Sequence, residues 1–186
     1  MLKKFYHKLC LLKARKIADA AQDYVEGSLL DVGSGRGHIA QEIQKRKNNK
    51  VQLLDVKDLN ETKLPYTLFD GERIPFEDNS FDTLLVCYVL HHTKDPAKLL
   101  RECARVSRKR IIIFEDNPKS LLTKPLDVIF NKLHGVATPL NFKTIEEWRQ
   151  IFKEHKLSVT SMQRGVEKEW FYPGVEHIMF VVDKVK

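Results

Sequence analysis

Alternating glycines follow an apolar segment near the start of the chain, in the order Asp31-x-Gly33-x-Gly35-x-Gly37. The apolar segment, residues 28–32, predicts a strand, and a helical pattern follows the glycines. Glycine permits backbone angles that are closed to other residues and lets a ligand lie against the main chain. The first turn of a helix adds N–H donors and a partial positive charge. This stretch therefore predicts a nucleotide-binding turn.

The spacing of the glycines narrows the kind of ligand. A dinucleotide fingerprint, G-x-G-x-x-G, would place its third glycine where His38 stands, whereas the glycine is Gly37. This disfavours a nicotinamide dehydrogenase. The arrangement D-x-G-x-G-x-G instead resembles the first motif of the class I S-adenosylmethionine (SAM)-dependent methyltransferases. The resemblance implies SAM as the cofactor.

Later segments extend the resemblance, over residues 25–116, to the type 11 subfamily, which includes ubiquinone and menaquinone methyltransferases. From residue 70 the chain reads DGERIPFEDNSFDTLLVCYVLHHTKDPAKLLRECARVSR. The family run is, in outline, D-A-E-x-L-P-F-x-D-x-S-F-D, a strand, H-H, D-P and a helix. Gly71 replaces the usual alanine, and Ser107-Arg108-Lys109 replaces a lysine-proline-glycine-glycine turn, which predicts a shortened loop away from the cofactor.

The resemblance also implies which residues contact the cofactor. Asp55, which ends a second apolar segment, would accept hydrogen bonds from both ribose hydroxyls, as in dinucleotide folds. Lys57 and Asp58 are alternatives on the same turn. Asp70 would accept a hydrogen bond from the adenine amino group, although D-G is itself a turn signal. The implied cofactor-binding set is Asp31, Gly33, Ser34, Gly35, Gly37, Asp55, Val56, Asp70, Gly71, Glu72, Cys87 and Tyr88.

Methyl transfer mainly requires that the acceptor be positioned, because the cofactor supplies the reactive carbon. A general base is needed only where the acceptor loses a proton. His91 and His92 are the candidates, since a histidine has a suitable pKa; the alternative is that they line the pocket. The same sheet edge offers Glu115, Asp116 and Asn117. No metal site is predicted, because adjacent residues point apart and no ligand spacing is present.

Strand and helix patterns alternate along the chain. Strands are predicted at 28–32, 51–55, 66–70, 83–90, 110–115, 157–162 and 175–183, and helices at 3–25, at 38–47, after Asp95, at 125–133 and after Thr144. This order predicts an α/β fold: a Rossmann-like three-layer sandwich whose mostly parallel, seven-stranded sheet ends in an antiparallel hairpin. We expect one domain over residues 1–186, with an N-terminal helix (1–26), a cofactor-binding half (27–116) and a substrate-side part (117–186).

Two regions have alternative interpretations. Leu2, Phe5, Leu9 and Leu12 predict an apolar face on the first helix, which Gly27 would end. That helix could be a membrane-surface or RNA-binding arm, but packing on the domain edge is favoured. Acceptor choice is expected in the loops at 134–144 and 165–174. There Trp170, Phe171 and Tyr172 would either stack on a flat acceptor or seal the sheet edge.

Composition limits the class of partner. The 186 residues carry a formal charge of +7, which suits an acidic partner such as RNA, but the basic groups are spread out and favour a basic solvated surface. Three scattered cysteines and the lack of a long apolar run predict a cytoplasmic protein without a transmembrane segment. A small-molecule methyltransferase is favoured. An RNA or protein methyltransferase and a non-catalytic SAM-binding protein are the alternatives, and the acceptor atom and oligomeric state stay open.

Overall fold

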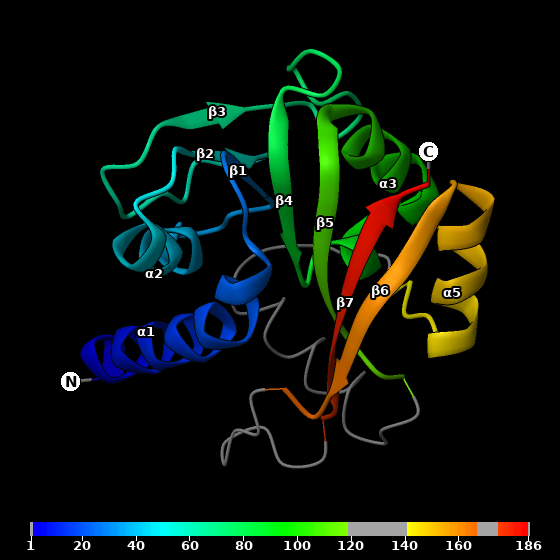
Figure 1. Ribbon diagram of the computed structural model, residues 1–186. Helices are drawn as coiled ribbons and strands as arrows, with labels where there is room; N and C mark the ends of the chain where they lie inside the picture. The colour runs from blue at the N-terminus through cyan, green and yellow to red at the C-terminus, as the bar shows by residue number, and fades with distance from the viewer. Residues whose placement is uncertain (1, 119–140, 167–174, 186) are drawn as a thin grey trace.

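Figure 1 shows the computed structural model, which describes residues 2–118, 141–166 and 175–185. A seven-stranded sheet has the order β3-β2-β1-β4-β5-β7-β6. Its strands are β1 (Leu29–Val32), β2 (Val51–Asp55), β3 (Tyr66–Leu68), β4 (Phe81–Cys87), β5 (Ser107–Asp116), β6 (Leu157–Arg164) and β7 (His177–Lys184). The first five strands are parallel, and β7 runs antiparallel to both β5 and β6. The predicted fold class is confirmed.

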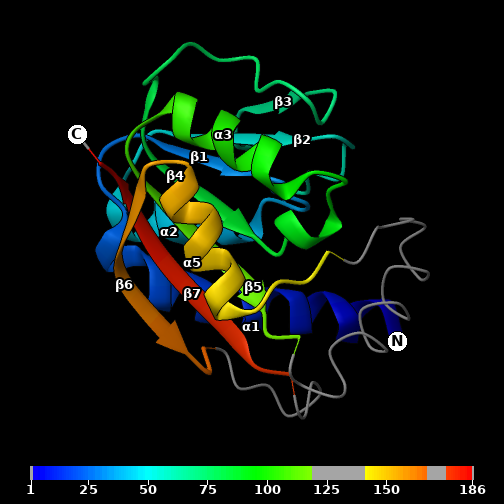
Figure 2. The same cartoon turned by 90° about the vertical axis from the view of Figure 1, so that its right-hand side faces the viewer.

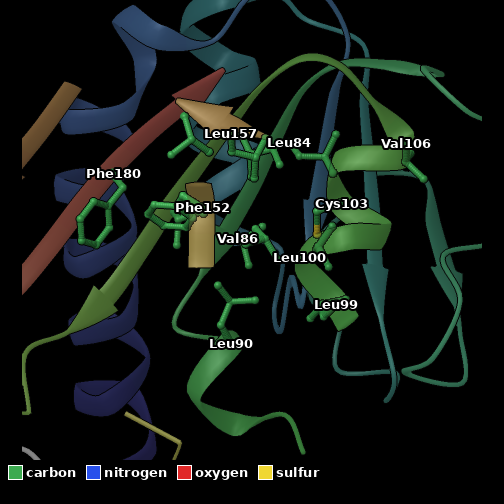
Figure 3. Close-up of a cluster of buried hydrophobic side chains, with 14 of the residues drawn as sticks. Leu84, Val86, Leu90, Leu99, Leu100, Cys103, Val106, Phe152, Leu157 and Phe180 are labelled. Atoms are coloured by element: carbon green, nitrogen blue, oxygen red, sulfur yellow. The ribbon is translucent and has the colours of Figure 1, made fainter. Parts of the chain in front are cut away.

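Helices cover both faces of the sheet (Figures 1 and 2). On one face α1 (Leu2–Ala21) and α2 (His38–Lys47) pack together, and on the other lie α3 (Pro96–Val106) and α5 (Ile145–Glu154). Figure 3 shows part of the second core layer, where α3 and α5 bury side chains such as Leu100 and Phe152 against the sheet. Within the described ranges, no helix is long and apolar enough to cross a membrane.

The two predicted helix starts have the expected caps. The Asp95 side chain accepts a hydrogen bond from the backbone of Lys98 at 2.9 Å, and Pro96 fills the first helical position. Thr144 and Glu147 exchange the two hydrogen bonds of a capping box. These caps fix where α3 and α5 begin, and so where the preceding loops leave the sheet.

The first helix differs from its prediction. It ends at Ala21, and a short 3-10 turn (Gln22–Tyr24) follows, so Gly27 lies beyond the helical segment. Leu12, on the predicted apolar face, is 43% exposed. The face that packs is instead made of small and branched residues that fit closely against α2: Ala14, Ile17, Ala18 and Ala21. The favoured packing on the domain edge is therefore found, through a different face.

Three boundaries also need correction. β4 runs from Phe81 to Cys87 and stops before residue 90, because Tyr88 takes a left-handed backbone angle (φ 57°) and a 3-10 turn, Leu90–His92, begins. β3 ends at Leu68. Ser107-Arg108-Lys109 are not a shortened loop but the first residues of β5. The predicted helix at 125–133 and the aromatic residues at 170–172 lie outside the described residues.

Candidate functional site

The turn from β1 into α2 is tied to β2 through its backbone. The N–H groups of Gly33 and Ser34 both donate to the carbonyl oxygen of Leu54, at 2.8 and 3.1 Å. The N–H of Gly37 donates back to Ser34 at 2.9 Å. Gly33, Gly35 and Gly37 have φ values of 69°, 52° and 76°, in the left-handed region that favours glycine. The loop conformation therefore requires this residue type at all three positions.

The surroundings of the three glycines differ. A Cβ on Gly33 would lie 2.3 Å from the Val89 side chain, and one on Gly37 would lie 2.7 Å from that of Leu53. A Cβ on Gly35 would meet no described atom within 4 Å. Gly33 and Gly37 are thus needed for close packing as well as for their angles. Gly35 instead presents bare backbone to open space, where a ligand can approach it.

The Asp55 carboxylate lies directly against this loop. Its Oδ2 accepts a hydrogen bond from the N–H of Gly35 at 2.7 Å, and its Oδ1 accepts from Val56 and Lys57 at 2.7 and 3.3 Å. The side chain is half-buried at the carboxyl end of β2. Asp58, an alternative on the same turn, is exposed and accepts only from the backbone of Asn60. The structure therefore brings Asp55, rather than Asp58, to the glycine loop.

Asp31 is a buried carboxylate beneath the loop. It is 1% exposed, and no described group makes a hydrogen bond to its Oδ2. Burial, together with the nearby charge of Asp55, raises the pKa of Asp31 to about 7. A buried carboxylate without a hydrogen-bonding partner is costly in isolation. A cationic or N–H-bearing ligand in the site would offset that cost.

The predicted adenine-side residues lie on the neighbouring turn. The N–H of Phe69 donates to the carbonyl oxygen of Asp55 at 3.1 Å, which places this turn beside β2. Asp70 is exposed and accepts from the backbone of Glu72 and Arg73, so its carboxylate forms a local turn. A Cβ on Gly71 would lie 3.3 Å from Val56, whose side chain is 59% exposed.

Glu72 also lies on this turn, but its carboxylate pairs with Lys98 of α3. It is therefore directed away from the group formed by Asp31 and Asp55. The Asp70 and Glu72 side chains therefore make contacts other than with the glycine loop.

The remaining residues of the predicted cofactor set lie at the carboxyl end of β4. Cys87 is buried, and Tyr88 follows with its left-handed backbone. Strained non-glycine residues of this kind gather at functional sites. The Lys13 ammonium lies over the Tyr88 ring, 4.2 Å from its centroid. The Tyr88 ring also lies edge-on to the His177 ring, with the two centroids 5.3 Å apart. Side chains of α1, β4 and β7 therefore meet beyond the carboxyl ends of the central strands.

His91 is held by a buried carboxylate. Its Nδ1 lies 2.5 Å from Oε2 of Glu115, and the other oxygen of Glu115 accepts from the backbone of Leu90 at 2.9 Å. The ring stacks on Phe142 with centroids 4.6 Å apart. His92 is only partly buried, and its ring lies 4.0 Å from that of His91. A buried carboxylate thus orients the His91 ring.

A second histidine–carboxylate pair, missed from the sequence, lies beside the first. Nδ1 of His177 is 2.6 Å from Oδ1 of Asp116. Burial raises the pKa of Asp116, but the hydrogen bond from His177 and the charges of His177, Lys13 and His91 outweigh it and lower the pKa overall. The antiparallel register of β5 and β7 places these residues opposite each other. This strand register could have identified the His177–Asp116 pair, but the spacing of residues in the sequence does not reveal the register.

The comparisons with known proteins agree with this geometry. Residues 30–114 match the family model described as a methyltransferase domain. The uncharacterized methyltransferase YcgJ of Bacillus subtilis is 25% identical over 160 residues, covering 77% of this chain and 62% of that protein. The crystal structure of YcgJ superposes with a TM-score of 0.66 at 17% identity, covering 91% of this chain and 98% of that one.

Two further relatives match a smaller part of the chain. The ubiquinone/menaquinone biosynthesis C-methyltransferase UbiE of Idiomarina loihiensis is 27% identical over 123 residues, covering 57% of this chain and 47% of that protein. The mouse protein named arginine-hydroxylase NDUFAF5, mitochondrial, is 33% identical over 96 residues, covering 48% and 27%. The chain thus spans less than two thirds of the length of these relatives.

Together with the motif and the sheet order, these matches define the class of protein. The fold is the Rossmann-like fold of the methyltransferases. Residues 30–114 are similar to the methyltransferase domain of type 11, and SAM is the cofactor of the class I SAM-dependent methyltransferases that this chain resembles. The residues present fit that cofactor, because Gly35 leaves its backbone open beside Asp55 and the buried Asp31.

Proposed function

We propose that this protein transfers a methyl group from SAM to a small-molecule acceptor. The observation that carries the proposal is the hydrogen bond from the open Gly35 backbone to the Asp55 carboxylate, near the buried Asp31. Bound SAM supplies an electrophilic methyl carbon on a sulfonium. Asp55 would hold the ribose hydroxyls, and Asp31 would face the positive end of the methionine group. The exposed Val56 side chain beside Gly71 offers an apolar surface for the adenine.

The acceptor would lie beyond the carboxyl ends of β4 and β5, where ligands bind in open α/β sheets. When the acceptor atom bonds to the methyl carbon, the carbon–sulfur bond of SAM would break and its electrons would stay on sulfur. Where the acceptor also loses a proton, we assign that proton to His91, because Glu115 at 2.5 Å would stabilise the imidazolium that forms. The role of the chain is otherwise to position the two reactants.

A second candidate is a SAM-binding protein that does not transfer the methyl group. It is favoured by the similarity of 48% of this chain to a protein named for hydroxylation. An RNA or protein acceptor is a third candidate, supported by the formal charge of +7. The spread of the basic residues along the sequence speaks against an RNA face.

The test incubates purified protein with methyl-labelled SAM and separate pools of metabolites, lipids, RNA and proteins. We expect label in the metabolite pool and formation of S-adenosylhomocysteine, with much less of both in an Asp55→Ala control at the same SAM concentration. Label only in RNA or protein would overturn the acceptor class. SAM binding without label in any pool would overturn methyl transfer. A thermal-shift experiment supplies the binding readout, with SAM and S-adenosylhomocysteine raising the melting temperature and NAD leaving it unchanged.

A further inference from the structure

Three side chains from separate elements converge next to the glycine loop, outside the site described above. His7 lies on α1, His38 is the first residue of α2, and Glu61 lies between β2 and β3. Their ligand atoms all lie within 4.8 Å of one another. Nδ1 of His7 is 3.4 Å from Oε2 of Glu61, and Nε2 of His38 is 3.2 Å from that same oxygen. Two imidazoles and a carboxylate thus point at one small volume.

These distances match the edges of a zinc coordination sphere. Zinc binds histidine nitrogens and carboxylate oxygens at 2.0–2.2 Å in a tetrahedron, so neighbouring ligand atoms lie about 3.3 Å apart. The two measured edges through Glu61 already have this length. The third edge is the distance between the two histidine nitrogens. A small movement of His7, whose side chain is 48% exposed, would bring it to the same length. Three protein ligands leave one position for water.

The anchoring of the ligands suits a metal ion. Arg36 forms an ion pair with the other oxygen of Glu61, which fixes the carboxylate in place. The nitrogen-rich donor set selects a borderline ion such as Zn²⁺ over Mg²⁺, which prefers oxygen ligands.

We propose that His7, His38 and Glu61 form a Zn²⁺ site that fastens the N-terminal helix to the cofactor loop. His7 lies on the side of α1 that packs on α2, because it precedes Ala14, Ala18 and Ala21 at helical spacing. His38 directly follows Gly37, and the N–H of Glu61 donates to the carbonyl oxygen of Arg36 at 3.2 Å. An ion here would link α1, the start of α2 and the β2–β3 loop. The proposal does not depend on methyl transfer.

The test titrates Zn²⁺, and separately Mg²⁺, into metal-free full-length protein by calorimetry. We expect one Zn²⁺ per chain with a dissociation constant in the micromolar range or below, a rise in melting temperature with Zn²⁺, and no binding of Mg²⁺. His7→Gln and Glu61→Gln should each weaken Zn²⁺ binding at least tenfold. His155→Gln, at the end of α5 on the opposite face, should leave it unchanged.

Co²⁺ provides a spectroscopic check on the ligands, because tetrahedral nitrogen and oxygen ligands give visible bands without a thiolate charge-transfer band. His7→Gln should lose those bands while its circular dichroism matches that of the wild type, since His7 is an exposed helical residue. Zn²⁺ bound equally well by His7→Gln, or a thiolate band that is lost in Cys10→Ser, would overturn the assignment. So would the absence of binding below millimolar Zn²⁺.

Discussion

The carboxylate of Asp55 accepts a hydrogen bond from the backbone N–H of Gly35, with Oδ2 and nitrogen 2.7 Å apart. The two residues are 20 positions apart: Gly35 lies in the loop after β1, and Asp55 ends the adjacent strand β2. The contact joins the carboxylate predicted for the ribose to the loop predicted for the methionine group. Asp55 therefore has two roles: its Oδ2 stabilises the glycine loop, and its carboxylate would also bind the cofactor.

Asp55→Ala should therefore weaken SAM binding. Loss of two charge-assisted hydrogen bonds to the ribose costs on the order of 2–3 kcal/mol, or roughly 30–150-fold in affinity. Calorimetric titration of SAM measures the change. The SAM affinity of Asp55→Asn should lie between those of the wild type and Asp55→Ala, because the amide oxygen can still accept the hydrogen bond from Gly35.

Asp58→Ala is the matched control, being an exposed carboxylate on the same turn. It should bind SAM like the wild type. If Asp58→Ala lost affinity and Asp55→Ala kept it, the ribose contact would have to be reassigned.

The buried Asp31 should make stability depend on pH. Its pKa is about 7 when folded and near 3.8 when unfolded, so between these values the folded protein binds more protons. Stability conferred on the protein by Asp31 therefore falls as the pH rises from about 4 to about 7. Asp31→Asn removes this loss. The free energy of unfolding of Asp31→Asn, relative to that of the wild type, should therefore increase as the pH rises across this range. The gain is on the order of a few kcal/mol, and urea denaturation at a series of pH values measures it.

Asp58→Asn should instead give a stability curve parallel to that of the wild type. SAM affinity supplies the complementary measurement, since an ionised Asp31 attracts a cationic ligand. Wild-type affinity should rise through pH 7, and that of Asp31→Asn should stay flat. Parallel stability curves for Asp31→Asn and the wild type would show that Asp31 has an ordinary pKa.

His91→Gln should lower the turnover of an acceptor that loses a proton, by about a hundredfold or more, which is the usual contribution of a general base. SAM affinity should stay unchanged, and the acidic limb of the pH–rate profile should disappear. The measurement is the rate of S-adenosylhomocysteine formation with the metabolite fraction that takes up label. His92→Gln is the control, since His92 is the neighbouring histidine and is only partly buried. A loss of less than threefold in His91→Gln would remove His91 as the base.

Local patterns predicted several helix and strand bounds, because the signals for them are close in sequence. The bounds of α2 and β2 and the caps at Asp95 and Thr144 follow from signals within a few residues. Leu12, on the predicted apolar face of α1, is exposed, because tertiary packing buries the side that carries Ala14, Ile17 and Ala21. Similarly, no short-range signal pairs His177 with Asp116, which meet through strand register.

The role of Gly35 supports the sharpest prediction. A side chain at this position would enter open space at the site, so folding should tolerate it sterically, while its left-handed angle (φ 52°) adds strain. Gly35→Val should therefore abolish SAM binding while far-UV circular dichroism stays near that of the wild type. Calorimetric titration of SAM measures the loss.

The control has to carry the same backbone strain away from the site. Gly27→Val is unsuitable, because a Cβ there would lie 2.2 Å from Oδ2 of Asp82 and disturb the start of β1. Asn48→Val is matched, since Asn48 is exposed at the end of α2 with φ 53°. It should lose stability to a similar extent as Gly35→Val and keep its affinity for SAM. Normal binding by Gly35→Val would show that the loop does not approach the cofactor. Equal loss in both variants would assign the effect to backbone strain rather than to a blocked site.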